Sequence, residues 1–401
     1  MQVIVLGAGI VGVTTAYFLA RQGLAVSVVD AAERVAAATS EANGGQLSYS
    51  FTESLATPGF ARALPALIAG RDAGTRLRLS PALLRWGMDF LRACGNARSR
   101  RNSLAQLELA ADSCRLLLQL RDETDIEFAF RRAGKLVLVG AADSRHAAAM
   151  TRWKQQQGYS VSLLSKSQAV AVEPALDEFA CDIAAAIYSP GDDVGDARAF
   201  ATELARHIEA QYGVEFRLGT PASRLIRERG RVVGVECGDR LMADSVVVCL
   251  GAWSNTLLGD VGLRLPIYPV RGYSVTLPSG SAPPSVSITV LSERFVYSCL
   301  NGDIRIAGFA DFFGLDRQRD TARVAELLAT AQRIAPEAAN YAASDTHSWG
   351  GFRPMTPDGR PLFGATGIPG LFLNTGHGML GWTLACATAQ ATAAAVVEEE
   401  C

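Results

Sequence analysis

The sequence predicts an α/β fold in which a Rossmann-like nucleotide-binding domain is interleaved with a second, α+β domain built on a mostly antiparallel sheet. Three observations predict it. A strand, a glycine-rich turn and a helix open the chain, β-type runs recur between residues 134 and 309, and a second glycine-rich turn precedes the last helix. The first domain is expected to comprise 1–55, 190–262 and 342–401, and the second 56–189 and 263–341.

The bulk composition excludes several classes of protein. The chain has 401 residues, 49% of them hydrophobic, and a formal net charge of −2. It is therefore long enough for roughly two or three domains and lacks the basic footprint of a nucleic-acid-binding protein. Its eight cysteines include no C-x-x-C pair, which predicts free thiols and no metal site. Without a signal peptide or an apolar run of about 20 residues, a soluble, cytoplasmic protein is expected.

The first strand and turn predict a dinucleotide site. A short apolar strand leads into "GAGIVG", which places Gly7, Gly9 and Gly12 in G-x-G-x-x-G spacing before a helix. The first glycine permits the tight turn, the second lets the backbone approach a pyrophosphate, and the third allows close helix–strand packing. The helix start then offers the N–H groups of Ile10 and Val11 to the phosphates. An ordinary glycine-rich βαβ turn is the alternative.

The next strand and loop extend this prediction. The strand "AVSVVD" ends on Asp30, which can accept both ribose hydroxyls. The motif alone does not separate NAD from FAD. The stretch 35–48, "VAAATSEANGGQLS", is small, polar and glycine-rich, and it suits contacts along a long buried cofactor. A mobile surface loop is the alternative.

A second glycine signature lies near the C-terminus. A strand at 371–374 leads into Gly376, Gly378 and Gly381, again in G-x-G-x-x-G spacing, and an alanine-rich helix follows. The chain ends twenty residues later, without a second strand and its acid, so a second nucleotide site is not expected. The helix start is expected to face the cofactor ring and stabilise negative charge on it. His377 either touches the ring or substrate or is held structurally in its loop.

The middle of the chain predicts helices followed by strands. Residues 59–101 are expected to be helical, with breaks at 70–74 and Pro81, and they carry nine arginines, two aspartates and no lysine. Composition favours a solvated helix face over a core, and the alternative is a docking face for an acidic partner or lipid headgroups. Helices are also expected at 104–124 and 195–213, and β-type runs at 134–140, 184–189, 214–219, 231–237, 244–253, 266–277 and 294–309. Small residues around Gly251 end one of these strands, where nucleotide folds place ligands.

One arginine stands apart in "HSWGGFRPMTPDGRPL". Arg353 lies between Phe352 and Pro354 in a run poor in charge, and a guanidinium there is costly to desolvate unless an anion meets it. It is expected either to grip a substrate carboxylate or to pair with an internal acid such as Asp358.

With these motifs assembled, the chain resembles the D-amino-acid oxidase-like family of FAD-dependent oxidoreductases, most closely its bacterial D-amino-acid dehydrogenase branch. "TSEANGGQLS", "YPVRGYS", "GGFRPMTPDGRPLFG" and "NTGHGMLGWTLA" fall in the family's order. The resemblance implies FAD, with its pyrophosphate at the first glycine motif and its ribose at Asp30. Because 351–355 contains no cysteine, the FAD is expected to be non-covalent.

The resemblance also implies the site residues. Arg353 holds the substrate carboxylate, and Tyr273 lies in the segment that supplies a substrate-facing tyrosine. The implied flavin-ring contacts are Ser40, Asn43, Gly44, Gly45, Gln46, Gly376, His377, Gly378 and Met379.

The expected activity is oxidative deamination of D-amino acids. A hydride passes from substrate Cα to flavin N5, and the imino acid hydrolyses to a 2-oxo acid. Small apolar or cyclic substrates such as D-proline or D-hydroxyproline are favoured, with electrons passing to a quinone or dye, and the basic stretch allows peripheral contact with the inner face of the membrane. The alternatives are an oxygen-dependent oxidase of glycine, sarcosine or proline, and a non-catalytic FAD-binding subunit.

Overall fold

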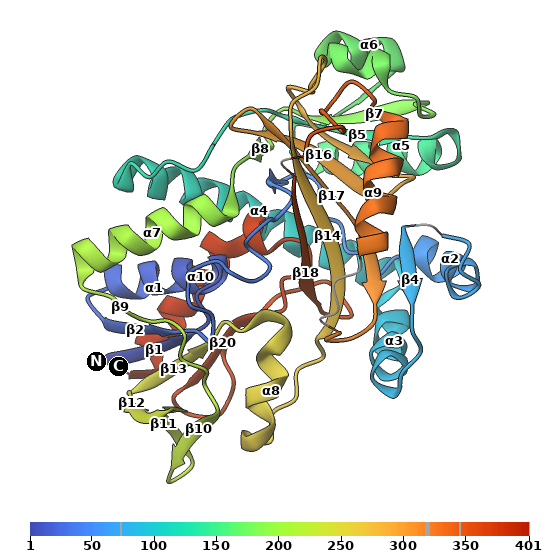
Figure 1. The fold of residues 1–401 in the computed structure, drawn as a ribbon. Helices are drawn as coiled ribbons and strands as arrows, with labels where there is room; N and C mark the ends of the chain where they lie inside the picture. The colour runs from blue at the N-terminus through green and yellow to red at the C-terminus, as the bar shows by residue number, and fades with distance from the viewer. Residues whose placement is uncertain (73, 317–320, 345, 401) are drawn as a thin grey trace.

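The computed structural model describes residues 1–72, 74–316, 321–344 and 346–400, so Cys401 lies outside it. Within these residues the strands form a six-stranded, a nine-stranded, a three-stranded and a two-stranded sheet. Figure 1 shows two main bodies, one around β1 with α1, α7 and α10, and one around the long strands β14, β17 and β18 with α9. This confirms the predicted class, a Rossmann-like sheet combined with a mostly antiparallel one.

The six-stranded sheet carries the predicted nucleotide fold. Its strands in spatial order are β19 (Leu362–Ala365), β20 (Leu371–Thr375), β13 (Ser245–Val248), β1 (Gln2–Leu6), β2 (Ala25–Val29) and β9 (Glu215–Arg217). All neighbours run parallel except β19, which is antiparallel to β20. Strands buried on both faces read as continuous apolar runs, which is why "VIVL" and "VVV" were visible in the sequence.

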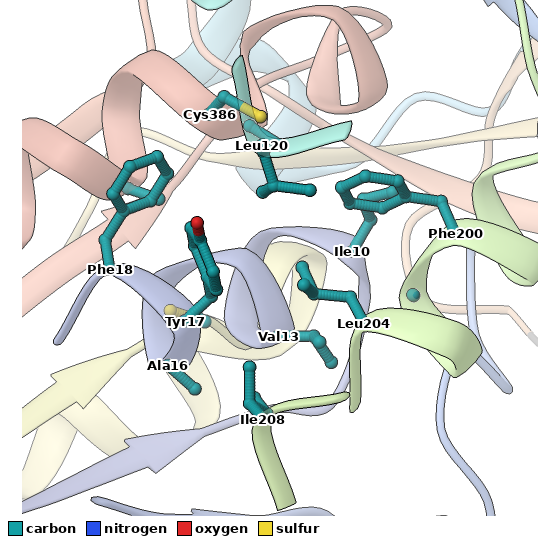
Figure 2. Packing of buried hydrophobic residues seen from close by; sticks show 14 of the residues in the cluster. Ile10, Val13, Ala16, Tyr17, Phe18, Leu120, Phe200, Leu204, Ile208 and Cys386 are labelled. Carbon is teal, nitrogen blue, oxygen red and sulfur yellow. The ribbon is translucent and has the colours of Figure 1, made fainter. Parts of the chain in front are cut away.

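Four helices cover one face of this sheet. They are α1 (Ile10–Arg21), α4 (Asn96–Thr124), α7 (Ala197–Tyr212) and α10 (Gly381–Glu400). Their apolar side chains meet in one buried cluster with alternate residues of β1 and β2. Figure 2 shows part of this packing, with Tyr17 and Val13 of α1 facing Leu204 and Phe200 of α7 and Leu120 of α4. The first and last helices of the chain thus share one core.

The opposite face is covered by a smaller layer. The antiparallel sheet β10 (Arg224–Glu228), β11 (Arg231–Cys237) and β12 (Asp239–Met242) packs there with the short helix α8 (Ser254–Leu258). Ile4 and Leu6 of β1 point into this layer, while Val3 and Val5 point to the helices. The period-two alternation of a strand therefore supplies both cores.

The nine-stranded sheet forms the second body. In spatial order it contains β18 (His347–Met355), β14 (Tyr268–Pro278), β17 (Asp303–Phe312), β16 (Phe295–Leu300), β15 (Ser287–Val290), β5 (Lys135–Val139), β7 (Ala185–Ser189) and β6 (Ser162–Leu164), with β4 (Thr75–Leu77) paired to β17. The helices α5 (Ser144–Gln156), α6 (Lys166–Val172) and α9 (Thr321–Ile334) belong to this body. Residues of α9 pack on β14 in a second buried cluster.

The arginine-rich stretch is not continuously helical. It forms α2 (Pro58–Ile68), the strand β4 and α3 (Pro81–Ala93), and then the start of α4. The prediction missed β4 because it is only three residues long, with Arg76 at its centre, and pairing with residues 310–312 of β17 makes it a strand. The expected breaks near Gly70 and Pro81 are present, since Pro81 opens α3.

The chain passes repeatedly between the two bodies. Of the stretch 342–401, β18 belongs to the nine-stranded sheet, whereas β19, β20 and α10 belong to the six-stranded sheet and its helix layer. A two-stranded sheet of β3 (Gln46–Leu47) and β8 (Asp193–Val194) lies where the two bodies meet. The two bodies are thus interleaved along the chain, and the predicted boundaries stay a proposal. They assign α4 to the second domain and β18 to the first, whereas α4 packs in the helix layer of the six-stranded sheet and β18 pairs in the nine-stranded sheet.

Candidate active site

The glycine turn lies at the carboxyl end of β1, where α1 begins. Gly7 has φ +109°, and a Cβ there would lie 2.7 Å from the Cys249 carbonyl oxygen. A Cβ on Gly12 would lie 1.8 Å from the Gly7 carbonyl oxygen, so no side chain fits between α1 and the turn. Gly9 is the N-cap of α1 and has only the Ser40 hydroxyl nearby, 3.5 Å from an added Cβ. The motif therefore leaves open backbone at Gly9 and a close helix–strand contact at Gly12, as a pyrophosphate site requires.

Ser40 joins the next loop to this helix start. Its hydroxyl accepts a hydrogen bond of 3.0 Å from the backbone N–H of Ile10. The following N–H groups, at Val11 and Gly12, have no partner within the helix because they belong to its first turn. An N-terminal turn of this kind attracts phosphate through its donors and its partial positive charge.

Asp30 stands at the end of β2, beside this turn. Its carboxylate accepts hydrogen bonds from the backbone N–H of Ala8 at 2.6 Å and of Ala32 at 2.8 Å. These bonds hold the carboxylate at the entrance to the glycine turn and leave lone pairs for further donors. The geometry suits the ribose role expected for it.

The loop after β2 crosses the face of the nine-stranded sheet. Thr39 donates to the Phe352 carbonyl oxygen of β18 at 2.8 Å, and the Ala42 carbonyl oxygen accepts from Ser274 of β14 at 2.8 Å. A Cβ on Gly44 would lie 3.2 Å from Val296 of β16. The loop thus lies between the two bodies and faces both.

Two charged side chains of the sheet fasten this loop. Arg305 of β17 donates to the Asn43 carbonyl oxygen at 3.2 Å and pairs with Asp196 at 3.1 Å. Lys135 of β5 donates to Gln46 Oε1 at 2.7 Å and to Ser48 at 2.6 Å. Burial lowers the pKa of Lys135 to about 8, although the nearby acids Asp192 and Glu53 counteract the shift. Sequence reasoning missed both cations, and the signal available was a charge inside an apolar strand.

The second glycine turn lies beside β18. Gly376 and Gly378 have φ values of +76° and +57°, which favour glycine, and the Gly378 N–H donates to the Pro354 carbonyl oxygen at 3.0 Å. Met379 is 48% exposed. Gly251 at the end of β13 adjoins this region, because its carbonyl oxygen accepts from Thr375 at 3.2 Å. The structure therefore brings the two glycine turns and Gly251 to the same carboxyl edge of the six-stranded sheet.

His377 turns away from this edge toward α10. Its Nε2 lies 2.9 Å from the Thr388 hydroxyl, and the side chain is buried. Burial lowers the pKa of the imidazole to about 3, so the ring is neutral at physiological pH. Of the two roles expected from the sequence, the geometry favours the structural one.

Arg353 projects from the face of the nine-stranded sheet that contacts the loop after β2, residues 39–48. In the register of β18 and β14 it pairs with Val270, and Gly351 pairs with Gly272. Paired residues of antiparallel strands project from the same face, and a Cβ on Gly351 would lie 3.2 Å from Thr39 of the loop. The guanidinium crosses Gly272, where an added Cβ would lie 2.4 Å from Nη2. Gly272 is thus a site residue that sequence reasoning missed, and a glycine inside a β-type run was the signal for a close approach.

The charge of Arg353 is not neutralised by an acid. Nη1 donates to the Phe309 carbonyl oxygen at 2.5 Å, and within the described residues no carboxylate pairs with the side chain. The alternative partner, Asp358, instead accepts from the Arg360 backbone N–H at 3.1 Å. Burial lowers the pKa of Arg353 to about 10, partly offset by Asp311, so the group remains cationic at neutral pH. This is a fork available to an anion.

Tyr273 projects from the other face of β14. It pairs with Gly350 and belongs to the core beneath α9. Its hydroxyl donates to Asp311 at 2.9 Å, and Asp311 also accepts from Arg323 of α9 at 3.1 Å. The structure therefore does not bring the Tyr273 hydroxyl beside the Arg353 guanidinium, and the hydroxyl is held in a buried network that fixes β17.

These features together define a class of protein. A glycine turn at a helix start, an acid at the end of the next strand and a cationic fork on a facing sheet form the site of a dinucleotide-dependent oxidoreductase. A family model described as "DAO: FAD dependent oxidoreductase" matches residues 2–395. The chain belongs to this family and is an FAD-dependent oxidoreductase. The residues fit FAD: Gly7 to Gly12 and the start of α1 would hold the pyrophosphate, Asp30 the ribose, and the two loops the ring.

Curated relatives match over nearly the full chain. The chain is 39% identical over 407 residues to "D-amino acid dehydrogenase 2" of Ralstonia nicotianae, covering 97% of this chain and 95% of the relative. It is 38% identical over 403 residues to "D-amino acid dehydrogenase" of Paramagnetospirillum magneticum, covering 98% and 94%.

Solved structures show the same fold at lower identity. Glycine oxidase from Bacillus cereus superposes with a TM-score of 0.75 at 21% identity, covering 100% of this chain and 95% of that one. L-proline dehydrogenase from P. horikoshii gives a TM-score of 0.75 at 18% identity, covering 99% and 93%.

Proposed function

We propose that this protein is a D-amino-acid dehydrogenase that oxidises the Cα–N bond of its substrate with non-covalently bound FAD. The observation that carries the proposal is Arg353, a half-buried cation without an acid partner among the described residues, on the sheet face that meets the loop 39–48. The names of the curated relatives, at 37–39% identity, support the D configuration.

The chain's own groups position the substrate. The Arg353 fork takes both carboxylate oxygens and so fixes the direction of the Cα–H bond. When bound, FAD supplies the acceptor for the hydride of that bond at N5. A strong base is not required, because the amine reaches its neutral form in the closed site; His377 is turned to Thr388 and is neutral. The imino acid hydrolyses to a 2-oxo acid in water, or remains cyclic if the substrate resembles proline.

The proposal extends to the substrate class and the electron acceptor. Small apolar or cyclic D-amino acids such as D-proline and D-hydroxyproline are the favoured substrates. Electrons pass to a quinone or dye, as the name dehydrogenase of the relatives implies. A peripheral contact with the inner face of the membrane would bring the protein to such an acceptor.

Anaerobic mixing with a panel of D- and L-amino acids tests the proposal. Loss of flavin absorbance with D-amino acids, including D-proline, and none with L-enantiomers is expected. A response to L-enantiomers alone would refute the substrate assignment, and no bleaching by any amino acid would support a non-catalytic FAD-binding subunit. Rapid peroxide production without quinone reduction would instead indicate an oxidase of glycine, sarcosine or proline.

A further inference from the structure

Helix α3 carries an apolar stripe that the fold does not cover. Leu84, Met88 and Leu91 recur at spacings of four and three residues, so they share one side of the helix. They are 58%, 53% and 44% exposed, whereas Leu83 and Phe90 on the other side are buried. Figure 1 shows α2, α3 and β4 together at the margin of the nine-stranded sheet, away from α1 and α7. The helix is therefore apolar on two sides, of which the fold uses one.

The residues around this stripe are apolar or cationic. Ile68 at the end of α2 is 58% exposed, and Leu79 just before α3 is 66% exposed. Of the nine arginines in 59–101, three pair with acids: Arg76 with Glu326, Arg78 with Asp316 and Arg92 with Asp89. Within the described residues the other six have no acidic partner; they are Arg62, Arg71, Arg85, Arg98, Arg100 and Arg101. A surface that only needed solvation would not leave this excess of one sign beside exposed leucines.

A cleft of about 440 Å³ opens beside the stripe, between α3, the start of α4 and the segment after β18. Arg92, Arg98, Arg101 and Arg360 line it, against two acids, Asp89 and Asp358. Arg98 donates to the Arg92 carbonyl oxygen at 3.0 Å. Neither Arg101 nor Arg360 pairs with an acid in the described part of the chain. The cleft thus gathers guanidinium groups around a space large enough for a phosphate.

We propose that the stripe and the arginine cleft form a docking site for an anionic phospholipid bilayer. Lipid phosphates enter the cleft and meet the planar forks of Arg98 and Arg101, while Leu84, Met88 and Leu91 enter the boundary between headgroups and acyl chains. Charge complementarity favours an anionic bilayer as the occupant. Arginines without acidic partners suit the layer of lipid phosphates, and the adjacent apolar side of α3 suits the acyl chains beneath that layer. Attachment is peripheral, since no described helix has the length and apolar character to cross a bilayer.

The docking site lies next to the proposed active site. Trp86 of α3 donates to the Met355 carbonyl oxygen at 2.9 Å, two residues from Arg353. Thr356, which lines the cleft, would lie 2.9 Å from a Cβ on Gly376. This placement would hold the second glycine turn near an electron acceptor dissolved in the lipid, an inference that rests on the proposed function.

Cosedimentation of the FAD-loaded protein with sucrose-filled vesicles tests the site. Vesicles of phosphatidylcholine with roughly 30% phosphatidylglycerol carry a negative surface potential that attracts basic segments. They are expected to sediment the protein at low salt and release most of it at high salt. Pure phosphatidylcholine vesicles are expected to sediment little. Inorganic phosphate distinguishes a free anion from a lipid: if it binds the cleft while anionic vesicles do not sediment the protein, the lipid assignment is refuted.

Matched variants locate the surface. The combined change Arg85→Gln, Arg98→Gln and Arg101→Gln is expected to weaken binding about fivefold per arginine, or roughly 100-fold in all. The same loss of charge at Arg145, Arg152 and Arg206, which are exposed on α5 and α7, is expected to leave binding unchanged. Leu84→Ser with Met88→Ser and Leu91→Ser is expected to remove the binding that survives high salt.

Three results would overturn the proposal. They are no sedimentation of the wild type at low salt, equal losses in the two arginine triples, and a concentration-dependent dimer that the serine variant abolishes, which would make the stripe an interface between two copies of the chain. Flavin bleaching by D-amino acids, measured without vesicles on the same samples, separates failure of docking from failure of the proposed activity.

Discussion

The guanidinium of Arg353 packs over Gly272, and no acid within the described residues pairs with its charge. Arg353→Lys should raise KM and lower kcat/KM by roughly 10- to 150-fold, because about 1.5–3 kcal/mol of charge-assisted hydrogen bonding is lost when a point charge replaces a fork. Steady-state kinetics with a dye acceptor measures this, and FAD content should stay normal. The control Arg333→Lys, an exposed arginine 3.5 Å from Glu293, should keep wild-type kinetics. Equal kinetics in the two variants would remove Arg353 from the carboxylate site.

His377 gives the fold a dependence on acid pH. Its pKa is about 3 in the folded protein and 6.5 in its ordinary range, so between these values the unfolded chain binds more protons. The stability that the neutral ring contributes is complete above pH 6.5 and is lost as pH falls toward 3. His377→Gln keeps a partner for Thr388 without titrating. From pH 6.5 to 5, wild-type unfolding free energy should fall up to about 2 kcal/mol more than that of the variant.

Urea unfolding at several pH values measures this difference. Parallel pH profiles for the two proteins would show that the imidazole is not held neutral.

Which residues of the site the sequence could predict depends on how local their constraints are. Gly7, Gly9, Gly12 and Asp30 act within one βαβ unit, so their spacing alone places them. Tyr273 and His377 are set by register and by packing of distant elements. A side chain of a strand changes face with a shift of one residue, and nothing near Tyr273 in the sequence states that Asp311 and Arg323 will take its hydroxyl.

At the scale of elements, α1 packs so closely on the turn before it that Gly12 has no room for a side chain. Gly12→Ala should destabilise the protein by about 1–3 kcal/mol or more, since its Cβ would lie 1.8 Å from the Gly7 carbonyl oxygen and must displace the helix. The FAD content of the purified variant should also fall. Thermal unfolding and the ratio of flavin to protein absorbance report the two effects.

Gly87→Ala is the matched control, because it is also a glycine within a helix. Nothing lies within 4 Å of a Cβ added there, so the change should stabilise the protein by about 0.5–1 kcal/mol. Equal effects of the two substitutions would contradict the close contact at Gly12.

Several of the longer elements were predictable, and their partners were not; the helices α5, α6 and α9 were not predicted. In long elements such as β14 and α7, the hydrophobic residues show the period of a strand or a helix over many residues, so the pattern predicts the element. By contrast, β3 and β8 are two-residue strands that exist because each pairs with the other across the 145 intervening residues 48–192. Likewise β4 needs β17, and the parallel neighbours β5 and β15 meet through a connection that no local pattern encodes.

At the scale of the whole molecule, the proposed cofactor site draws on both bodies, because the loop 39–48 follows β2 and crosses β18, β14 and β16. FAD held there without a covalent bond should be released by acid or heat, and its return should stabilise the apoprotein by about 4 kcal/mol at 1,000 times its dissociation constant. Flavin fluorescence of the supernatant after acid precipitation, and the Tm of the apoprotein with and without FAD, measure the two outcomes. Yellow colour that stays with the precipitate would contradict non-covalent binding.

The pairing of α1 with the C-terminal elements has a consequence for synthesis of the chain. Thr15 of α1 receives a hydrogen bond from Asn374, 359 residues later, and α10 completes the core that Tyr17 and Val13 begin. At about 5–20 residues per second, on the order of 20 to 70 s separate the emergence of these partners from the ribosome. Throughout that interval the nascent glycine turn and its apolar helix lack their cover. The newborn chain is therefore expected to need a chaperone until its last helix is released, and to acquire its flavin only afterwards.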